Sequence, residues 1–243
     1  MAALPAPPLQ SGQGRGGLSP LPWWPDQPVP PWAWAPGDQG TPALLMLDRR
    51  AAGAADSTAA LVSLLDRDEQ ERAQRFRRPD DRDRYQLGRA ALRQVLGAWL
   101  DRDPAALCFR YGPHGKPALA GAVDGAPHFN ISHSGDLILL AFHAAAPVGI
   151  DVERQQAGLD WLPIARRCLL AAQVESLLAL PPAEAASAFV ELWCALEAGL
   201  KARGVGLAQA CQVQSLAMEP RLRRWRLALP PGYAGAVALL DPV

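Results

Sequence analysis

The sequence predicts a mixed α+β protein, because it contains both apolar segments of strand length and long segments with helical spacing. Residues 137–142 form an unbroken apolar run, which is typical of a buried strand. Residues 183–202 place large apolar side chains at spacings of four, three and four from Phe189 to Leu200, which is typical of one face of a helix. With 243 residues, the chain is long enough for one large domain or two smaller halves.

The first 40 residues are crowded with proline and glycine, which interrupt the hydrogen bonding of helices and strands. We expect residues 1–40 to be an extension with little regular structure, followed by an N-terminal subdomain over 41–143 and a C-terminal subdomain over 144–243. We favour an extension that packs as a strap on the folded part over a partner-binding segment. The reason is that four tryptophans carry too much aromatic surface to stay in water without cause: Trp23, Trp24, Trp32 and Trp34.

The N-terminal subdomain begins with residues 43–47, which predict a buried strand, and residues 57–65, which predict a helix capped by Asp56. Residues 67–84 hold the densest charge in the chain, and a solvated helix face with ion pairs is the usual outcome of such a run. Residues 85–99 then repeat apolar side chains on one helical face. Arginines held beside that packed helix are able to grip phosphate.

A short predicted strand at 109–111 precedes a turn, Gly112 to Pro117, that combines two glycines with one lysine. The spacing is not that of a Walker A loop, and a proline follows the lysine. Such a turn still lets the backbone approach a flat or anionic ligand and places one cation beside it. Further along, His133 is either a satisfied core imidazole or a ligand. A nucleophile pair with Ser132 is disfavoured, because adjacent strand residues point to opposite faces.

Residues 147–153 form an apolar strand pattern that ends in two acids. Alternation puts Asp151 and Glu153 on one face of the strand, and Ile150 and Val152 on the other. Two carboxylates about 6 to 7 Å apart along a strand repel each other unless a cation or strong donors lie between them. Mg²⁺ prefers oxygen ligands of this kind. A strand whose acidic end runs out into solvent is the alternative.

Helical patterns cover residues 161–180 and 183–202, and the second ends at Gly204, a favourable C-cap. Glu197 and Lys201 lie one turn apart on that helix, which by itself predicts an ordinary surface ion pair. Two strands that close a second sheet are predicted near the C-terminus: residues 224–229 and 236–240.

Whole-chain composition argues against several classes of protein. The 24 basic residues equal the 24 acidic ones, so we do not expect binding to nucleic acid or to an anionic membrane. Four widely spaced cysteines without a Cys-x-x-Cys pair argue against a zinc knuckle or a disulfide framework. The longest apolar stretch is too short for a membrane-spanning helix, and no secretory signal pattern opens the chain. We therefore expect a cytoplasmic protein.

Five sequence blocks together resemble the Sfp-type 4′-phosphopantetheinyl transferases over about residues 43 to 240. The match lies in their order and spacing rather than in any one motif. The resemblance implies two similar α/β halves, each a helix packed on a small antiparallel sheet, with coenzyme A in the cleft between them. The five blocks are Arg75-Phe76 with Asp81 to Tyr85, Gly115-Lys116-Pro117, Asn130 to Ser134, Gly149 to Glu153, and Trp193 to Lys201.

The resemblance also implies a reaction. A serine hydroxyl of an apo acyl or peptidyl carrier protein attacks the β-phosphorus of coenzyme A, and adenosine 3′,5′-bisphosphate leaves. Asp151, Glu153 and Glu197 are implied ligands of Mg²⁺, and Lys201 is implied to contact the pyrophosphate. The proton acceptor stays open among Glu197, a water on the metal ion and the surroundings of the carrier serine.

Further coenzyme A ligands are implied in the N-terminal subdomain, where cations, a turn and a hydroxyl would surround a doubly phosphorylated nucleotide. By resemblance these are Lys116 and His133 at the 3′-phosphate, Arg72 or Arg75 with Arg84 completing a basic pocket, Gly115 and Pro117 flanking the adenine, and Ser132 donating to a phosphate.

Two positions depart from the family pattern. Leu196 stands where the family usually has a lysine before the glutamate of the last helix, and Gln173 lies where an F-F-x-x-x-E pattern usually supplies an acid. Losing one positioned catalytic group commonly costs on the order of 10² to 10³ in rate. These departures keep open a non-catalytic or weakly active coenzyme A-binding relative. A metal-dependent phosphohydrolase, which needs only the carboxylates, is a further alternative. Two halves in one chain would make a monomer sufficient.

Overall fold

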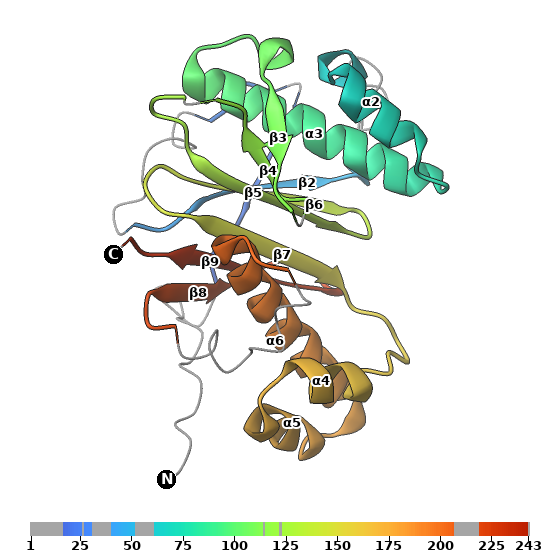
Figure 1. Cartoon of the computed structure of the whole chain (residues 1–243). Coiled ribbons are helices and arrows are strands. Elements are labelled where there is room, and N and C mark those ends of the chain that lie inside the picture. Colours follow the sequence, from blue (N-terminus) through green and yellow to red (C-terminus); the bar gives the residue numbers. More distant parts are fainter. Residues whose placement is uncertain are drawn as a thin grey trace. The chain divides into compact units, whose positions relative to one another are not determined.

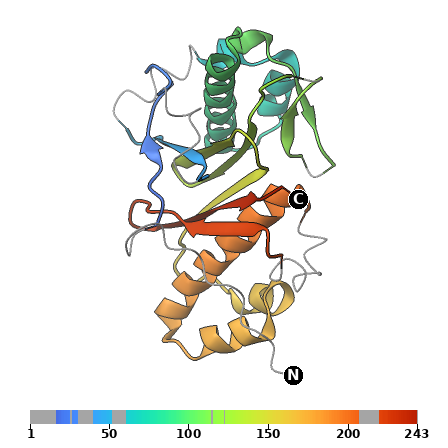
Figure 2. The same cartoon turned by 90° about the vertical axis from the view of Figure 1, so that its left-hand side faces the viewer.

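The structure, a computed structural model, describes residues 17–25, 27–30, 40–51, 61–113, 115–121, 123–206 and 219–242. The chain divides into two compact units, which are drawn together in Figures 1 and 2. We call the described part of residues 20–145 the N-terminal unit, and the described parts of 1–19 and 146–243 the C-terminal unit. Both units are built from a long helix packed on a small sheet, so the predicted α+β class is confirmed.

The N-terminal unit contains a four-stranded sheet in the order β1-β2-β6-β5. Its strands are β1 (Leu21–Pro22), β2 (Ala43–Asp48), β5 (His128–Ser134) and β6 (Leu137–His143). All seven residues of β6 are buried, and antiparallel neighbours flank it on both sides, so it is a central strand of the sheet. The two-residue β1 pairs with β2 in parallel, so this sheet is antiparallel except at one edge.

Helices α2 (Arg67–Gln74) and α3 (Pro79–Leu100) pack in this unit, with the short 3₁₀ turns η2 (Val62–Leu64) and η3 (Pro104–Ala106). The charged run expected as one helix over 67–84 is interrupted, and α3 starts at Pro79, a favourable first helical residue. A proline disfavours helical geometry in the residue before it, so α2 has to end before Arg78. A separate hairpin, β3 (Phe109–Tyr111) and β4 (Pro117–Leu119), follows.

The core of the N-terminal unit lies between α3 and the sheet. Leu92, Val95 and Leu96 of α3 are fully buried together with residues of β2 and β6. Trp23 and Trp24 join the same cluster with 5% and 9% of their surface exposed, as expected for a strap. Trp32, Trp34 and residues 57–60 of the helix predicted over 57–65 lie outside the described residues. The described end of that segment contains only the 3₁₀ turn η2.

The C-terminal unit contains a three-stranded antiparallel sheet in the order β7-β9-β8. Its elements are β7 (Val148–Arg154), α4 (Leu162–Cys168), α5 (Ala171–Leu178), α6 (Pro182–Arg203), β8 (Leu222–Arg226) and β9 (Tyr233–Leu240). The segment expected as a helix over 161–180 is broken in two, because Leu169 and Leu170 take extended backbone geometry. None of the described helices is long and apolar enough to cross a bilayer.

Candidate active site

Helix α6 packs directly on strand β7 at a glycine. A Cβ added to Gly149 would lie 2.1 Å from the carbonyl oxygen of Ala198 and 2.3 Å from the backbone nitrogen of Ala202. These distances are shorter than any real Cβ contact, so no side chain fits between the strand and the helix. A glycine inside a strand often marks such a close backbone approach. The contact brings residues about 50 positions apart in sequence onto one surface.

The two acids of β7 share the face of Gly149, because strand residues alternate. Lys201 of α6 reaches this face and its Nζ lies 2.6 Å from Oδ1 of Asp151. The Asp151 side chain is 5% exposed, whereas that of Lys201 is 29% exposed. The ion pair therefore has a buried carboxylate and a more accessible ammonium. Ile150 and Val152, on the opposite face of β7, are buried as the alternation predicts.

Glu197 lies one turn before Lys201 on α6 and belongs to the same electrostatic cluster. Burial raises the pKa of Glu197, Lys201 lowers it, and the charges of Asp151 and Glu153 raise it further. Burial and the negative charge of Asp151 raise the pKa of Cys194 on the preceding turn, and its Sγ donates to the carbonyl oxygen of Ala234 at 3.5 Å. The four predicted residues of β7 and α6 are thus close enough to act on one another.

We tested whether this cluster suits Mg²⁺. The donor chemistry fits, because three carboxylates offer only oxygen ligands, and burial together with the charges of Asp151 and Glu153 raises the pKa of Glu197. Within the described part of the chain, however, no group of three or more His, Cys, Asp and Glu side chains lies close enough to share a metal ion. In this structure the ammonium of Lys201 supplies the positive charge at Asp151.

In the N-terminal unit, Arg84 and His133 both lie near the turn between β5 and β6. Arg84 donates to the carbonyl oxygen of Gly135 at 2.8 Å and pairs with Asp81. His133 is exposed on β5 and shares a face with Ile131, whose Cδ1 lies 2.8 Å from the Cβ position at Gly88 of α3. Ser132 points to the opposite face of β5 and is 8% exposed.

Lys116 lies in the turn between β3 and β4, beside His128. Burial and the charge of Lys116 lower the pKa of His128, which places the ammonium near the first residue of β5. His133 follows five residues later, roughly 17 Å along an extended strand. Gly115 in the turn has a φ of 75° and open space at its Cβ position, so glycine relieves backbone strain there. Pro117 pairs with Tyr111 across the hairpin.

Arg72 and Arg75 lie near the end of α2, and both are exposed. The guanidinium carbon of Arg72 lies 5.5 Å from the ring centroid of Tyr85 and 5.3 Å from that of Tyr111. Of the two arginines proposed as alternatives, Arg72 is therefore the one that the structure holds against aromatic rings beside the hairpin.

Both departures from the family pattern have structural roles. Leu196 is partly buried against the hydrophobic cluster of the C-terminal unit. The side-chain oxygen of Gln173 accepts a hydrogen bond from the backbone nitrogen of Leu170 at 3.1 Å, which stabilises the start of α5. Neither side chain replaces the missing charge.

Several residues around these sites were not found from the sequence. Cys194 lies close enough to Asp151 for its charge to raise the pKa of the thiol. Its position three residues before Glu197 and seven before Lys201, on one helical face, could have indicated this. Glu69, Arg89 and Arg93 form a buried charged network in the N-terminal unit, although they lie in segments that look like solvated or apolar helix surface. Gly149 could have been found, because a glycine within a strand pattern predicts a close approach of another backbone.

Comparisons with known proteins agree for both units. A family model described as 4′-phosphopantetheinyl transferase superfamily matches residues 147–227, and one described as 4′-phosphopantetheinyl transferase, N-terminal, matches residues 53–145. Three relatives carry related names. A putative 4′-phosphopantetheinyl transferase of Synechocystis sp. is 34% identical over 70% of this chain and 73% of its own length. HetI of Nostoc sp. is 35% identical over 66% and 68%, and Sfp of Bacillus subtilis is 32% identical over 60% and 63%.

Proposed function

Because this chain belongs to the 4′-phosphopantetheinyl transferase superfamily, we propose that it transfers the 4′-phosphopantetheine group of coenzyme A to a serine of an apo acyl or peptidyl carrier protein. The serine oxygen bonds to the β-phosphorus while the bond from that phosphorus to the adenosine 3′,5′-bisphosphate oxygen breaks. The observation that carries the proposal is the convergence of Asp151, Glu153, Glu197 and Lys201 where α6 packs on β7.

Each of these side chains has a role that follows from its position. The Lys201 side chain is 29% exposed and its ammonium is anchored on Asp151, so it can contact the pyrophosphate and favour departure of the negatively charged leaving group. Asp151, at 5% exposure, holds that ammonium in place. We propose Asp151, Glu153 and Glu197 as the ligands of Mg²⁺, which when bound would neutralise charge on the pyrophosphate oxygens. Glu197 is also a candidate to accept the serine proton.

For the N-terminal unit we propose a role in holding the nucleotide. Lys116 on the hairpin turn and His133 on β5 are candidates for phosphate groups of the nucleotide, with Arg72 and Arg84 as further cations. Because Lys116 lies beside His128 and His133 follows roughly 17 Å along the strand, the two would contact different phosphates, and the 3′-phosphate expected for both from the resemblance is assigned to Lys116. Arg84 is supported by its fixed position, since it donates to the carbonyl oxygen of Gly135 at 2.8 Å. Arg72 is supported by its contacts with two tyrosine rings.

The deciding experiment incubates the protein with coenzyme A, Mg²⁺ and a panel of apo carrier proteins, and records the intact mass of each carrier. Addition of one phosphopantetheine group supports the proposal, and Lys201→Met, which removes the charge at 2.6 Å from Asp151, should abolish most of it. Carriers that stay unmodified throughout the panel, with coenzyme A still bound in calorimetry, would instead favour a binding protein. Phosphate release without a carrier would favour a phosphohydrolase.

Leu196 allows a second test of activity against binding. A Leu196→Lys variant restores the lysine usual in the family, at a position that is partly buried against the hydrophobic cluster. If the chain has lost turnover through this position, the variant gains transfer activity. If another group replaces the lysine, the variant only loses packing and its thermal midpoint falls.

We also propose that the protein acts as a monomer in the cytoplasm. In support, two units that both match family models lie in one chain, and Cys108, Cys168 and Cys194 are free thiols, as is usual in a reducing compartment. Sedimentation velocity tests the first point and cell fractionation the second. A stable dimer or a membrane-bound fraction would contradict them.

A further inference from the structure

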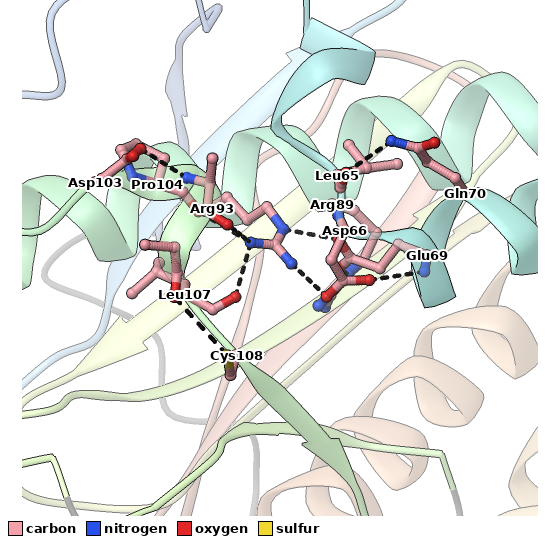
Figure 3. A network of polar contacts seen from close by, with 12 residues as sticks. Leu65, Asp66, Glu69, Gln70, Arg89, Arg93, Asp103, Pro104, Leu107 and Cys108 are labelled. Carbon is pink, nitrogen blue, oxygen red and sulfur yellow. Dashed lines mark hydrogen bonds and ion pairs between the residues drawn. The ribbon is translucent and has the colours of Figure 1, made fainter.

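A buried charged network links α2 to α3 in the N-terminal unit (Figure 3). The side chains of Glu69, Arg89 and Arg93 are 1%, 4% and 0% exposed. Arg93 Nε donates to Glu69 Oε2 at 2.7 Å, and Arg89 Nε donates to Glu69 Oε1. Glu69 is fixed in addition by a capping box with Asp66. Charges buried this deeply contribute little net stability compared with apolar residues of the same size. We therefore looked for a role in positioning neighbouring backbone and side chains.

Arg93 controls how the chain leaves α3. Its Nη1 donates to the carbonyl oxygens of Pro104 at 2.9 Å and Leu107 at 2.8 Å, and its Nη2 donates to Asp66 at 2.6 Å. Leu107 comes two residues before β3. The network therefore ties the backbone that enters the hairpin to the start of α2, as the dashed lines in Figure 3 show.

The first strand of the hairpin lies on a layer of arginines. Phe109 and Tyr111 share one face of β3 by alternation. The guanidinium carbon of Arg89 lies 4.2 Å from the ring centroid of Phe109 and 5.8 Å from that of Tyr111, and Arg72 lies 5.3 Å from Tyr111. The attraction between a cation and an aromatic face is strongest where water is excluded. The Arg89 side chain is buried.

The core fixes the base of the hairpin, where Leu119 is buried and Phe109 packs against the same cluster. The two strands of the hairpin form three residue pairs, and an isolated two-stranded hairpin is at best marginally stable. Phe109, at the base, also contacts Phe129 edge-on, with ring centroids 6.2 Å apart. Tyr111, next to the turn, is 40% exposed and is held by Arg72 and Arg89. The end of the hairpin that carries Lys116 therefore depends on the arginine layer.

We propose that Glu69, Arg89 and Arg93 are positioning residues for the nucleotide: they fix β3 and thereby the turn that presents Lys116 to coenzyme A. The inference rests on the proposed function, since it assigns the turn to coenzyme A. Glu69 orients the two arginines, Arg89 supports the aromatic face of β3, and Arg93 fixes the entry into that strand. None of the three has to touch the ligand.

The test is Arg89→Met, which keeps the apolar stem, removes the charge above Phe109 and leaves Glu69 paired with Arg93. We expect the KM for coenzyme A to rise about tenfold. In metal sites, removing the residue that supports a ligand lowers affinity by about that factor or more. The KM for the carrier and kcat should stay within about twofold, because the acids on β7 and α6 are untouched. Arg110→Ala, on the opposite face of the same strand, is the matched control and should leave all three constants unchanged.

Coupling to Lys116 distinguishes positioning from direct binding. If Arg89 acts through the turn, adding Arg89→Met to Lys116→Ala should weaken coenzyme A binding no further in calorimetry, because the two residues share one effect. Losses that multiply would overturn the proposal. Hydrogen exchange gives a readout that needs no activity: in Arg89→Met, the amides of β3 and β4 should exchange faster while those of α3 keep their protection. Exchange that stays unchanged in the hairpin would also overturn it.

A second variant covers the case in which Arg89→Met does not fold. Tyr111→Ala removes a side chain that is 40% exposed, leaves no buried charge unpaired and should produce the same selective rise in the KM for coenzyme A. If the unaltered protein binds coenzyme A and Tyr111→Ala binds it equally well, the positioning role is wrong. If the unaltered protein itself binds no coenzyme A, the proposed function is wrong.

Discussion

Replacing Gly149 by alanine should separate α6 from β7 and disable the candidate active site. The added Cβ would lie 2.1 Å from the carbonyl oxygen of Ala198, whereas ordinary contact begins at 3.4 Å, so the helix has to move by about 1.3 Å. Both obstructing atoms are backbone atoms, which cannot rotate away as a side chain can. Overpacking of this kind costs about 1 to 3 kcal/mol, and we expect the upper end.

The displacement acts on activity as well as on stability. Lys201 and Glu197 lie on the helix that has to move, and Asp151 lies on the strand. A misplacement of about 1 Å can cost roughly 10²-fold in rate, so we expect a loss of that order in carrier modification. For about 3 kcal/mol, the thermal midpoint should fall by about 6 °C or more. The assays are initial rates from carrier mass spectra and thermal unfolding followed by circular dichroism.

The matched control is Gly199→Ala on the same helix. There the added Cβ meets Leu222 Cδ2 at 3.0 Å and Arg224 Nε at 3.4 Å, both of which belong to side chains that can rotate. Alanine also favours a helix over glycine by about 1 kcal/mol, so stability should change little. A Gly149→Ala protein with an unchanged midpoint and rate would refute the close-packing argument. Equal damage from both substitutions would show that the loss comes from replacing glycine in general.

Three further predictions concern single side chains. Lys201→Met should lower kcat by roughly 10² to 10³ in carrier modification with the fold intact by circular dichroism; a rate within twofold of the original contradicts the assigned role. An NMR titration should give His128 a pKa below its usual 6.5, and Lys116→Met should raise that pKa. In the unaltered protein the lowered pKa favours neutral His128 in the folded state. The stabilisation from His128 is therefore present above pH 6.5 and is lost as the pH falls through the lowered pKa. Iodoacetamide should label exposed Cys108 in the native protein but Cys194 only after unfolding, since burial raises the pKa of the Cys194 thiol; peptide mass spectra that show early labelling of Cys194 would contradict its placement.

Much of the secondary structure follows from the sequence, because strand alternation and helical periodicity are local properties. The apolar run in 137–142 became β6, and the spacing in 183–202 became α6. Boundaries were harder to predict where a local break interrupts a continuous pattern. The helix expected over 161–180 is two helices, since Leu169 and Leu170 are extended, and composition alone does not indicate that break.

The candidate site was predictable only in part. The sequence placed Asp151 and Glu153 on one strand face and Glu197 and Lys201 one helical turn apart, and these relations hold. The 2.6 Å contact between Lys201 and Asp151 was not expected from the sequence, which by itself paired Lys201 only with Glu197 one turn away. That outcome depends on which element packs on which.

The sequence by itself determined the α+β class and the residue types available for phosphate chemistry, because local patterns carry both, and it determined the family through the order of five blocks along the chain. Tertiary structure alone decided that α6 meets β7 through Gly149, and that Glu69 holds Arg89 and Arg93 beneath the hairpin. The physical reason is that a side chain's partners depend on how elements far apart in sequence pack, and a local pattern carries no record of that packing.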